Sequence, residues 1–262
     1  MTSLADRTIT ALRDTHDQLA TVVPTLSADQ LAAPSGATEW TVAQVLSHLG
    51  SGAEIAHAGY RAALSGTAAP DQDFIQAVWD RWNARSPQEQ AAGFLEYDAA
   101  LVDTLDALTP QEREDLHVKL GFLPDPLPLT SVAGMRLHET VLHTWDARVA
   151  LDPDATLDSR SVDVLVEHFT GGLGFLLGFI GKADNLSEPA RVRIADSDVV
   201  IAVDDQVSLS TSATDETATF SGAPEAAIRL MGGRLRPPFT PAGLKVTGNV
   251  TLDDLRRVFP GY

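Results

Sequence analysis

Four long segments of this chain place apolar residues at helical spacing, and short polar links separate them. Amphipathic helices of this length bury their apolar stripes against one another, so the pattern predicts an antiparallel four-helix bundle. The second segment has a clear start, because Gln44 follows Thr41 by three residues as in a capping box. The four segments are residues 4–23, 38–64, 86–108 and 130–150.

A shorter helix and a loop complete this half of the chain. Residues 72–84, which include Trp79 and Trp82, are predicted to form a short helix. The segment 120–130 contains three prolines and is predicted to be a loop, since proline lacks the amide hydrogen that a helix needs.

The character of the sequence changes after the linker-like segment 151–158. We predict one helix over 158–181 and then short strands, because the following segments alternate or are rich in β-branched residues. The strands are expected at 190–196, 198–203, 206–212 and 217–222, with helices at 224–231 and 251–259. We therefore expect an all-α domain over residues 1–155 and a smaller α+β domain over residues 156–262.

The charge and the apolar content narrow the classes of partner. The formal net charge is -17, from 19 basic and 36 acidic residues. Phosphate contacts need clustered lysine and arginine, so the chain is not expected to bind nucleic acid. The charged N-terminal segment does not resemble a signal peptide, and no apolar run reaches the ~18 residues of a membrane span. We expect a cytoplasmic protein without a membrane partner, as a monomer or homodimer.

The chain contains no cysteine. Disulfides, a cysteine nucleophile and thiolate metal ligands are therefore excluded. Any metal must be held by nitrogen and oxygen, and any thiol chemistry must use a thiol from another molecule.

The segment 134–151, GMRLHETVLHTWDARVAL, carries the best candidate site. Glu139 and His143 are four residues apart, so on a helix they project from one face and can meet one ion. His138 lies five residues before His143, which excludes the HExxH arrangement of zincins. Glu139 would therefore be a ligand and not a base.

A third ligand must come from elsewhere, and His48 is the best candidate. It lies in an apolar run and shares a helix face with Val45 and Gly52, so it should point inward. Two histidines and one carboxylate with an open position are typical of catalytic zinc. The plainer alternative is that His48 is a hydrogen-bonded core histidine, since isolated histidines usually are. His16, His57, His117 and His168 are interpreted as surface or helix-end residues, and His138 as an interior one.

Other catalytic motifs are missing from the sequence. It has no GxSxG elbow, no P-loop and no GxGxxG at a strand–helix junction.

Three segments resemble one known family. EWTVAQVLSHLGSGAE (39–54) is similar to the W-x-V-x-x-[VL]-x-x-H-[LI] segment of the mycothiol-dependent maleylpyruvate isomerase family, within the DinB-like metal-binding superfamily. The segment 134–151 is similar to its second signature, in which H-E-x-x-x-H-x-W-D begins a late bundle helix. GAPEAAIRLMGGRL (222–235) resembles its C-terminal G-x-x-x-x-L-x-x-[LM]-x-G-R segment.

The resemblance implies a DinB-like bundle followed by a sterol-carrier-like α+β domain. It implies that His48, Glu139 and His143 bind a divalent metal, with zinc expected, and that mycothiol is the cosubstrate. The implied reaction is addition of the thiol to a small electrophile, as in cis–trans isomerisation of a maleylpyruvate-like substrate or in thiol S-transfer.

The resemblance also gives Arg234 as the catalytic candidate, because it matches an arginine of the C-terminal segment. Its guanidinium suits a substrate carboxylate, although a surface arginine at a helix end is an equal alternative. Arg81 and Arg85 are weaker candidates. Asp146 can orient His143 or simply pair locally, and Trp40 and Trp145 are expected in the core or in a pocket wall.

Two alternatives to a thiol-dependent enzyme stay open. One is a thiol-independent isomerase or cyclase of specialised metabolism that uses the same metal site. The other is a non-catalytic protein that binds a small molecule with the same fold.

Overall fold

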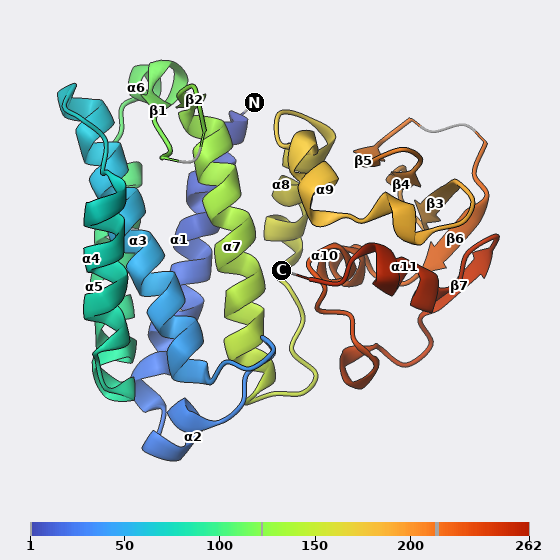
Figure 1. Cartoon of the computed structure of the whole chain (residues 1–262), viewed down its shortest axis with the longest axis horizontal. Helices are drawn as coiled ribbons and strands as arrows, with labels where there is room; N and C mark the ends of the chain where they lie inside the picture. The colour runs from blue at the N-terminus through green and yellow to red at the C-terminus, as the bar shows by residue number, and fades with distance from the viewer. Residues whose placement is uncertain (1, 122, 213–214, 262) are drawn as a thin grey trace. The chain divides into compact units, whose positions relative to one another are not determined.

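The computed structural model describes residues 2–121, 123–212 and 215–261 (Figure 1). The chain divides into two compact units, residues 1–155 and residues 156–262. The first unit is helical and the second contains the main sheet. The predicted fold class, a helical bundle followed by a small α+β domain, is confirmed.

Four long helices build the first unit. They are α1 (Leu4–Val22), α3 (Val42–Ser65), α5 (Pro87–Asp106) and α7 (Leu129–Val149). Helices α1 and α3 do not pair closely, but each packs against both α5 and α7. The pairs α1/α5 and α3/α7 are antiparallel, whereas α3 and α5 run in the same direction, because α4 (Gln72–Asn83) returns the chain between them (Figure 1).

The helix starts follow from local sequence. Thr41 accepts a hydrogen bond from Gln44 N (3.2 Å), and Gln44 Oε1 accepts one from Thr41 N (2.8 Å), as the predicted capping box requires. Ser86 and Glu89 cap α5 in the same way, with Pro87 at the first helical position. These contacts satisfy backbone N–H groups at the helix start, which have no carbonyl partner within the helix.

Gly50, in the middle of α3, allows a close helix contact. A Cβ atom at this position would lie 2.1 Å from the Trp82 ring of α4. Glycine weakens an isolated helix by about 1 kcal/mol, but here it lets a large indole bury against the α3 backbone. Trp82 is 1% exposed as a result.

The predicted loop at 120–130 is partly wrong. Leu127–Pro128 (β2) pairs antiparallel with His117–Val118 (β1), and α7 begins directly afterwards at Leu129. The prolines exclude a helix but permit a short edge strand. Phe122, within this segment, lies outside the described residues. Two short helices, α2 (Ala28–Ala32) and α6 (Pro110–Asp115), complete the connections.

The second unit begins with two helices where one was predicted. The expected helix 158–181 is broken into α8 (Ser159–Thr170) and α9 (Gly174–Ile180), which are bent by 91°. Gly171 leaves the helical region at φ -119° and ψ -130°, and two glycines in succession favour a break at this point. Among the described residues, no single helix has the length and hydropathy of a membrane span, although α8 and α9 meet that test jointly.

A five-stranded sheet forms the rest of the core, in the order β5-β4-β3-β6-β7. Only β3 and β6 are parallel among the described pairs, and the other neighbours are antiparallel. The fifth strand was not predicted, because β7 is largely exposed and lacks alternation. The strands are β3 (Ala190–Ile194), β4 (Val200–Val203), β5 (Val207–Ser210), β6 (Ala218–Ser221) and β7 (Lys245–Gly248), with helices α10 (Pro224–Met231) and α11 (Leu252–Val258).

Candidate metal centre

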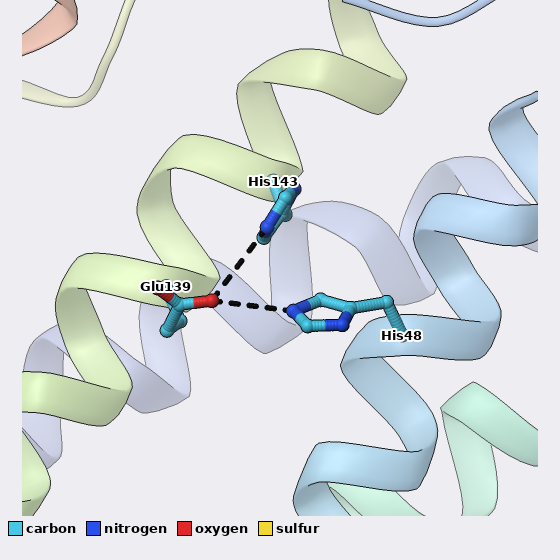
Figure 2. Close-up of side chains that lie close together, drawn as sticks. All are labelled: His48, Glu139 and His143. Atoms are coloured by element: carbon cyan, nitrogen blue, oxygen red, sulfur yellow. Dashed lines mark hydrogen bonds and ion pairs between the residues drawn. The ribbon is translucent and has the colours of Figure 1, made fainter. Parts of the chain in front are cut away.

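The three predicted ligands converge in the first unit. Glu139 and His143 project from successive turns of α7, and His48 faces them from α3 (Figure 2). Oε2 of Glu139 lies 3.2 Å from Nε2 of His48 and 3.6 Å from Nε2 of His143. Because α3 and α7 are antiparallel neighbours, a residue near the start of α3 meets the second half of α7.

The spacing of these atoms fits a divalent metal. One donor atom from each residue lies within 4.8 Å of the others, and this is the one such group found among the described residues. Ligands about 2.0–2.1 Å from a tetrahedral zinc ion lie about 3.3 Å from one another. The two short separations match that value, and the donor set of two imidazoles and a carboxylate suits zinc.

Asp146 orients His143 for this role. Its carboxylate accepts a hydrogen bond from Nδ1 of His143 (2.9 Å), so Nε2 is the nitrogen directed at Glu139. Asp146 is fully buried, and its carbonyl accepts a hydrogen bond from Gly36 N (2.8 Å). A Cβ atom on Gly36 would lie 2.8 Å from the Asp146 carboxylate, so this close approach requires glycine.

The electrostatics favour charged groups at the centre. Burial raises the pKa of Glu139, but hydrogen bonds from His143 and His48 outweigh it and hold that pKa well below the usual value. Burial lowers the pKa of His143, but the hydrogen bonds to Asp146 and Glu139 outweigh it and raise that pKa. A carboxylate that stays ionised is the form that binds a metal.

Trp40 covers the two histidines. Its ring centroid lies 5.7 Å from that of His143 in a stacked arrangement and 5.1 Å from that of His48. Trp40 is 36% exposed, which agrees with the expected pocket wall rather than with the core. Glu39, the preceding residue, has a φ of 67°, a conformation that non-glycine residues rarely adopt.

The centre is open on one side. The side chains of His48 and Glu139 are 39% and 33% exposed, whereas that of His143 is 7% exposed. A metal held here would be anchored on its inner side and accessible from its outer side. An open coordination position is the arrangement expected of a catalytic site.

A second histidine–carboxylate cluster was missed from the sequence. His16 was expected at the surface or a helix end, but it is buried in the middle of α1 and its Nδ1 lies 2.9 Å from Asp98 of α5. Arg136 of α7 donates to the other oxygen of Asp98 (2.8 Å) and to the carbonyl of Leu49 (2.9 Å). Asp98 lies four residues after Phe94 on the apolar face of α5, and this placement is the signal that identifies it.

The remaining arginine and histidine candidates lie outside the group of three predicted ligands. Arg81 pairs with Glu54, and Arg85 lies over the Trp82 ring with its guanidinium carbon 4.0 Å from the centroid. His138 is buried, as expected, and His168 lies at the end of α8 but is buried too. Arg234 belongs to the second unit, where it is buried and donates to the carbonyl of Gly232 (2.6 Å).

The chain is similar to two solved structures. One is the crystal structure of the mycothiol-dependent maleylpyruvate isomerase and the other is that of a histidine-to-alanine mutant, at 15% and 14% identity. Each match has a TM-score of 0.66 and covers 95% of this chain and 98% of the solved chain. At this identity the likeness shows a shared fold.

A family comparison goes further than the fold. The model of the mycothiol maleylpyruvate isomerase N-terminal domain matches residues 12–148, a little over half of the chain. A comparison with curated proteins gave no match. The matched range contains His48, Glu139 and His143 and follows the bundle from α1 to α7. The chain therefore belongs to the mycothiol-dependent maleylpyruvate isomerase family.

Proposed function

We propose that this protein is a metal-dependent enzyme that activates mycothiol for addition to a small electrophile, with cis–trans isomerisation of a maleylpyruvate-like substrate as its first candidate reaction. The observation that carries the proposal is the convergence of His48, Glu139 and His143 on one open point. Family membership supports the thiol, and the donor set supports zinc.

The residues of the chain hold and orient the reacting groups. His48, Glu139 and His143 would bind the metal, and Asp146 would fix the ring of His143. A bound zinc ion would supply positive charge that favours the thiolate form of the cosubstrate at neutral pH. Trp40 covers the two histidines and so limits the approach of water to that side of the centre.

The proposed isomerisation needs no external oxidant or reductant. The thiolate sulfur adds to one alkene carbon of the cis-enone, and the electron pair of the double bond moves to the adjacent carbonyl to give an enolate. The former double bond is then single and rotates. Return of the electron pair restores the alkene in the trans form and releases the thiolate. An S-transferase would instead protonate the adduct at carbon and keep the new C–S bond.

Arg234 keeps its predicted role as a partner for a substrate carboxylate, as part of this proposal. The match of Arg234 to an arginine of the family's C-terminal segment supports this role, since the fork of donors on a guanidinium suits a carboxylate. Arg234→Lys should raise KM for an anionic substrate by about tenfold and leave the metal content unchanged. An unchanged KM would show that Arg234 does not bind the substrate.

Metal analysis of the purified protein is the first test. Wild type should bind one zinc per chain, and His48→Ala and His143→Ala should lose it together with mycothiol-dependent turnover. His57→Ala is the matched control, because His57 lies on the same helix as His48 but bonds to Thr104 instead. Unchanged metal content in His48→Ala would show that the ligand set is wrong.

Turnover assays separate the thiol-dependent enzyme from its alternatives. Activity that persists without any thiol would favour a metal-site isomerase or cyclase of another kind. Binding of mycothiol without turnover over a broad range of enones would favour a non-catalytic protein.

A further inference from the structure

Arg136 of α7 reaches the backbone of α3 about one helical turn from the candidate metal centre. Its Nη2 donates a hydrogen bond to the carbonyl of Leu49 (2.9 Å), the residue that follows His48 in the chain. On α7, Arg136 precedes Glu139 by three residues, which is slightly less than one turn. This hydrogen bond therefore crosses the same interface between α3 and α7 that His48 and Glu139 span.

The guanidinium of Arg136 is also held from α5. The same Nη2 donates to Oδ1 of Asp98 (2.8 Å), and Oδ2 of Asp98 lies 2.9 Å from Nδ1 of His16. The side chains of Arg136 and Asp98 are 9% and 2% exposed, so water scarcely competes for these charge-assisted bonds. One nitrogen of Arg136 thus bridges a buried carboxylate of α5 and a backbone carbonyl of α3.

Gly52 lets the guanidinium approach α3 closely. A Cβ atom at this position would lie 2.9 Å from Nη1 of Arg136, which is too short for an ordinary contact. Gly52 follows His48 by four residues on α3, so the two share a helix face. Glycine weakens an isolated helix, but here it admits the arginine to the backbone of α3.

The relative position of α3 and α7 decides whether the three ligands can meet one ion. Glu139 and His143 both lie on α7, so that helix alone sets their spacing, whereas His48 comes from α3. Metal sites need ligand distances within about 0.2 Å of their standard values. One residue of a helix rises ~1.5 Å, so even a small slide of α3 along α7 would move His48 out of range.

We propose that Arg136 is a positioning residue for the metal centre. Its bond to the carbonyl of Leu49 fixes α3 along α7 where His48 meets Glu139 and His143. Asp98 holds the guanidinium in the orientation that this bond needs. The role rests on the metal centre of the proposed function, and it does not depend on which reaction the centre supports.

Two glycine-to-alanine variants of α3 test this role with little risk to the fold. Gly52→Ala forces the flexible end of Arg136 to move, whereas among the described residues a Cβ atom at Gly59 would meet only Val118, at 3.8 Å. Both variants place a better helix former in the same helix. In competition with a chelator of known affinity, Gly52→Ala should bind zinc about threefold more weakly than wild type, and Gly59→Ala should match wild type.

A spectrum of the cobalt-loaded protein gives a readout that a loss of stability would not change. The visible absorption of Co²⁺ depends on its coordination geometry, so it reports the position of His48. Arg136→Met should change this spectrum and lower zinc affinity about tenfold. Leu105→Ala is the control for stability, because it opens a cavity in the last turn of α5 but keeps the bond between Arg136 and α3.

Asp98→Asn is a second control. Asparagine keeps an oxygen that accepts from Arg136, so zinc affinity and the cobalt spectrum should match those of wild type.

The outcomes separate this inference from the proposed reaction. Equal zinc affinities of Gly52→Ala and Gly59→Ala, or an unchanged cobalt spectrum in folded Arg136→Met, would overturn the positioning role and leave the proposed reaction standing. A difference between the glycine variants without any thiol-dependent turnover in wild type would support the positioning role and overturn the reaction. Wild type that bound no zinc or cobalt would overturn both.

Discussion

The bundle holds two clusters of histidine and carboxylate that differ in how completely their groups are paired. In the first, Asp98 is enclosed by His16 and Arg136, and the side chains of His16 and Asp98 are 8% and 2% exposed. In the second, Glu139 faces His48 and His143, and the side chains of Glu139 and His48 are about a third exposed.

The difference indicates which cluster can bind a ligand. Each oxygen of Asp98 has a protein partner, and the arginine supplies a permanent positive charge. The Glu139 cluster pairs its carboxylate with two imidazoles instead, and its donor atoms converge where solvent can reach. Closed pairing stabilises a fold or its specificity, whereas convergent donors with an open side suit a metal.

Breaking the closed cluster should give the largest effect. Asp98→Ala leaves Arg136 buried without its carboxylate, and we expect a loss of about 3–5 kcal/mol in the free energy of unfolding. Urea denaturation measures this loss. Asp103→Ala is the control, because Asp103 pairs with Arg13 at the surface and should cost about 0–1 kcal/mol. Equal losses in the two variants would contradict the distinction between the clusters.

Loosening the open cluster should affect metal binding more than folding. Asp146→Asn keeps the volume of Asp146 but removes the charge beside His143, so zinc affinity should fall about tenfold or more. Competition with a chelator of known affinity measures the change. Asp103→Asn is the control and should leave the zinc affinity unchanged. If Asp103→Asn lowered the zinc affinity as much as Asp146→Asn does, the change in net charge alone would explain the effect.

Many features of the two clusters can be predicted from the sequence, but not all of them. Local rules predict the capping box at Thr41 and the one-turn spacing of Glu139 and His143, because each involves neighbouring residues. His48 lies 91 residues from Glu139, so its place on an apolar helix face made it a candidate, and the resemblance to a family then supported it as the third ligand. The pairing of Asp98 with Arg136 depends on how α5 and α7 face each other across the interior of the bundle, which no local pattern specifies.

Two errors in the predicted fold also arise because tertiary packing is not specified by local sequence. The apolar run after Gly171 continues the helical periodicity of α8, so a single helix was predicted where packing and two glycines produce a bend. Strand β7 forms by pairing with β6, although its own residues show no strand alternation. Elements that tertiary contacts define are the ones that local propensity misses.

The stabilisation that zinc gives to the protein should depend on pH. The raised pKa of His143 means that its ion pairs stabilise the metal-free protein below its usual 6.5, and that this contribution is lost as pH rises through the raised value. Zinc requires the neutral imidazole, so its affinity rises over the same range. The zinc-induced increase in Tm should therefore grow from pH 6 to pH 8, as scanning calorimetry would record.

The lowered pKa of Asp98 predicts the opposite dependence for the closed cluster. Burial opposes ionisation of Asp98, but the hydrogen bond from His16 and the charge of Arg136 outweigh it. The stability it contributes is present above the usual pKa of 3.8 and is lost only as pH falls through the lowered value. Asp98→Asn should therefore flatten the stability profile below pH 4 and leave the zinc response between pH 6 and 8 intact. A changed zinc response would show that the two clusters are coupled.

Strain beside the open cluster should give the smallest effect. Among the described residues of the first unit, Glu39 is the one non-glycine residue with positive φ, and it precedes Trp40 over the histidines. Glu39→Gly removes the steric cost of about 1 kcal/mol but adds backbone entropy to the unfolded chain, so we expect a net gain of about 0.5 kcal/mol. Urea denaturation of the metal-free protein measures it. A loss of stability would show that contacts of the Glu39 side chain outweigh its backbone strain, and the contrast between a relaxed closed cluster and a strained open one would then fail.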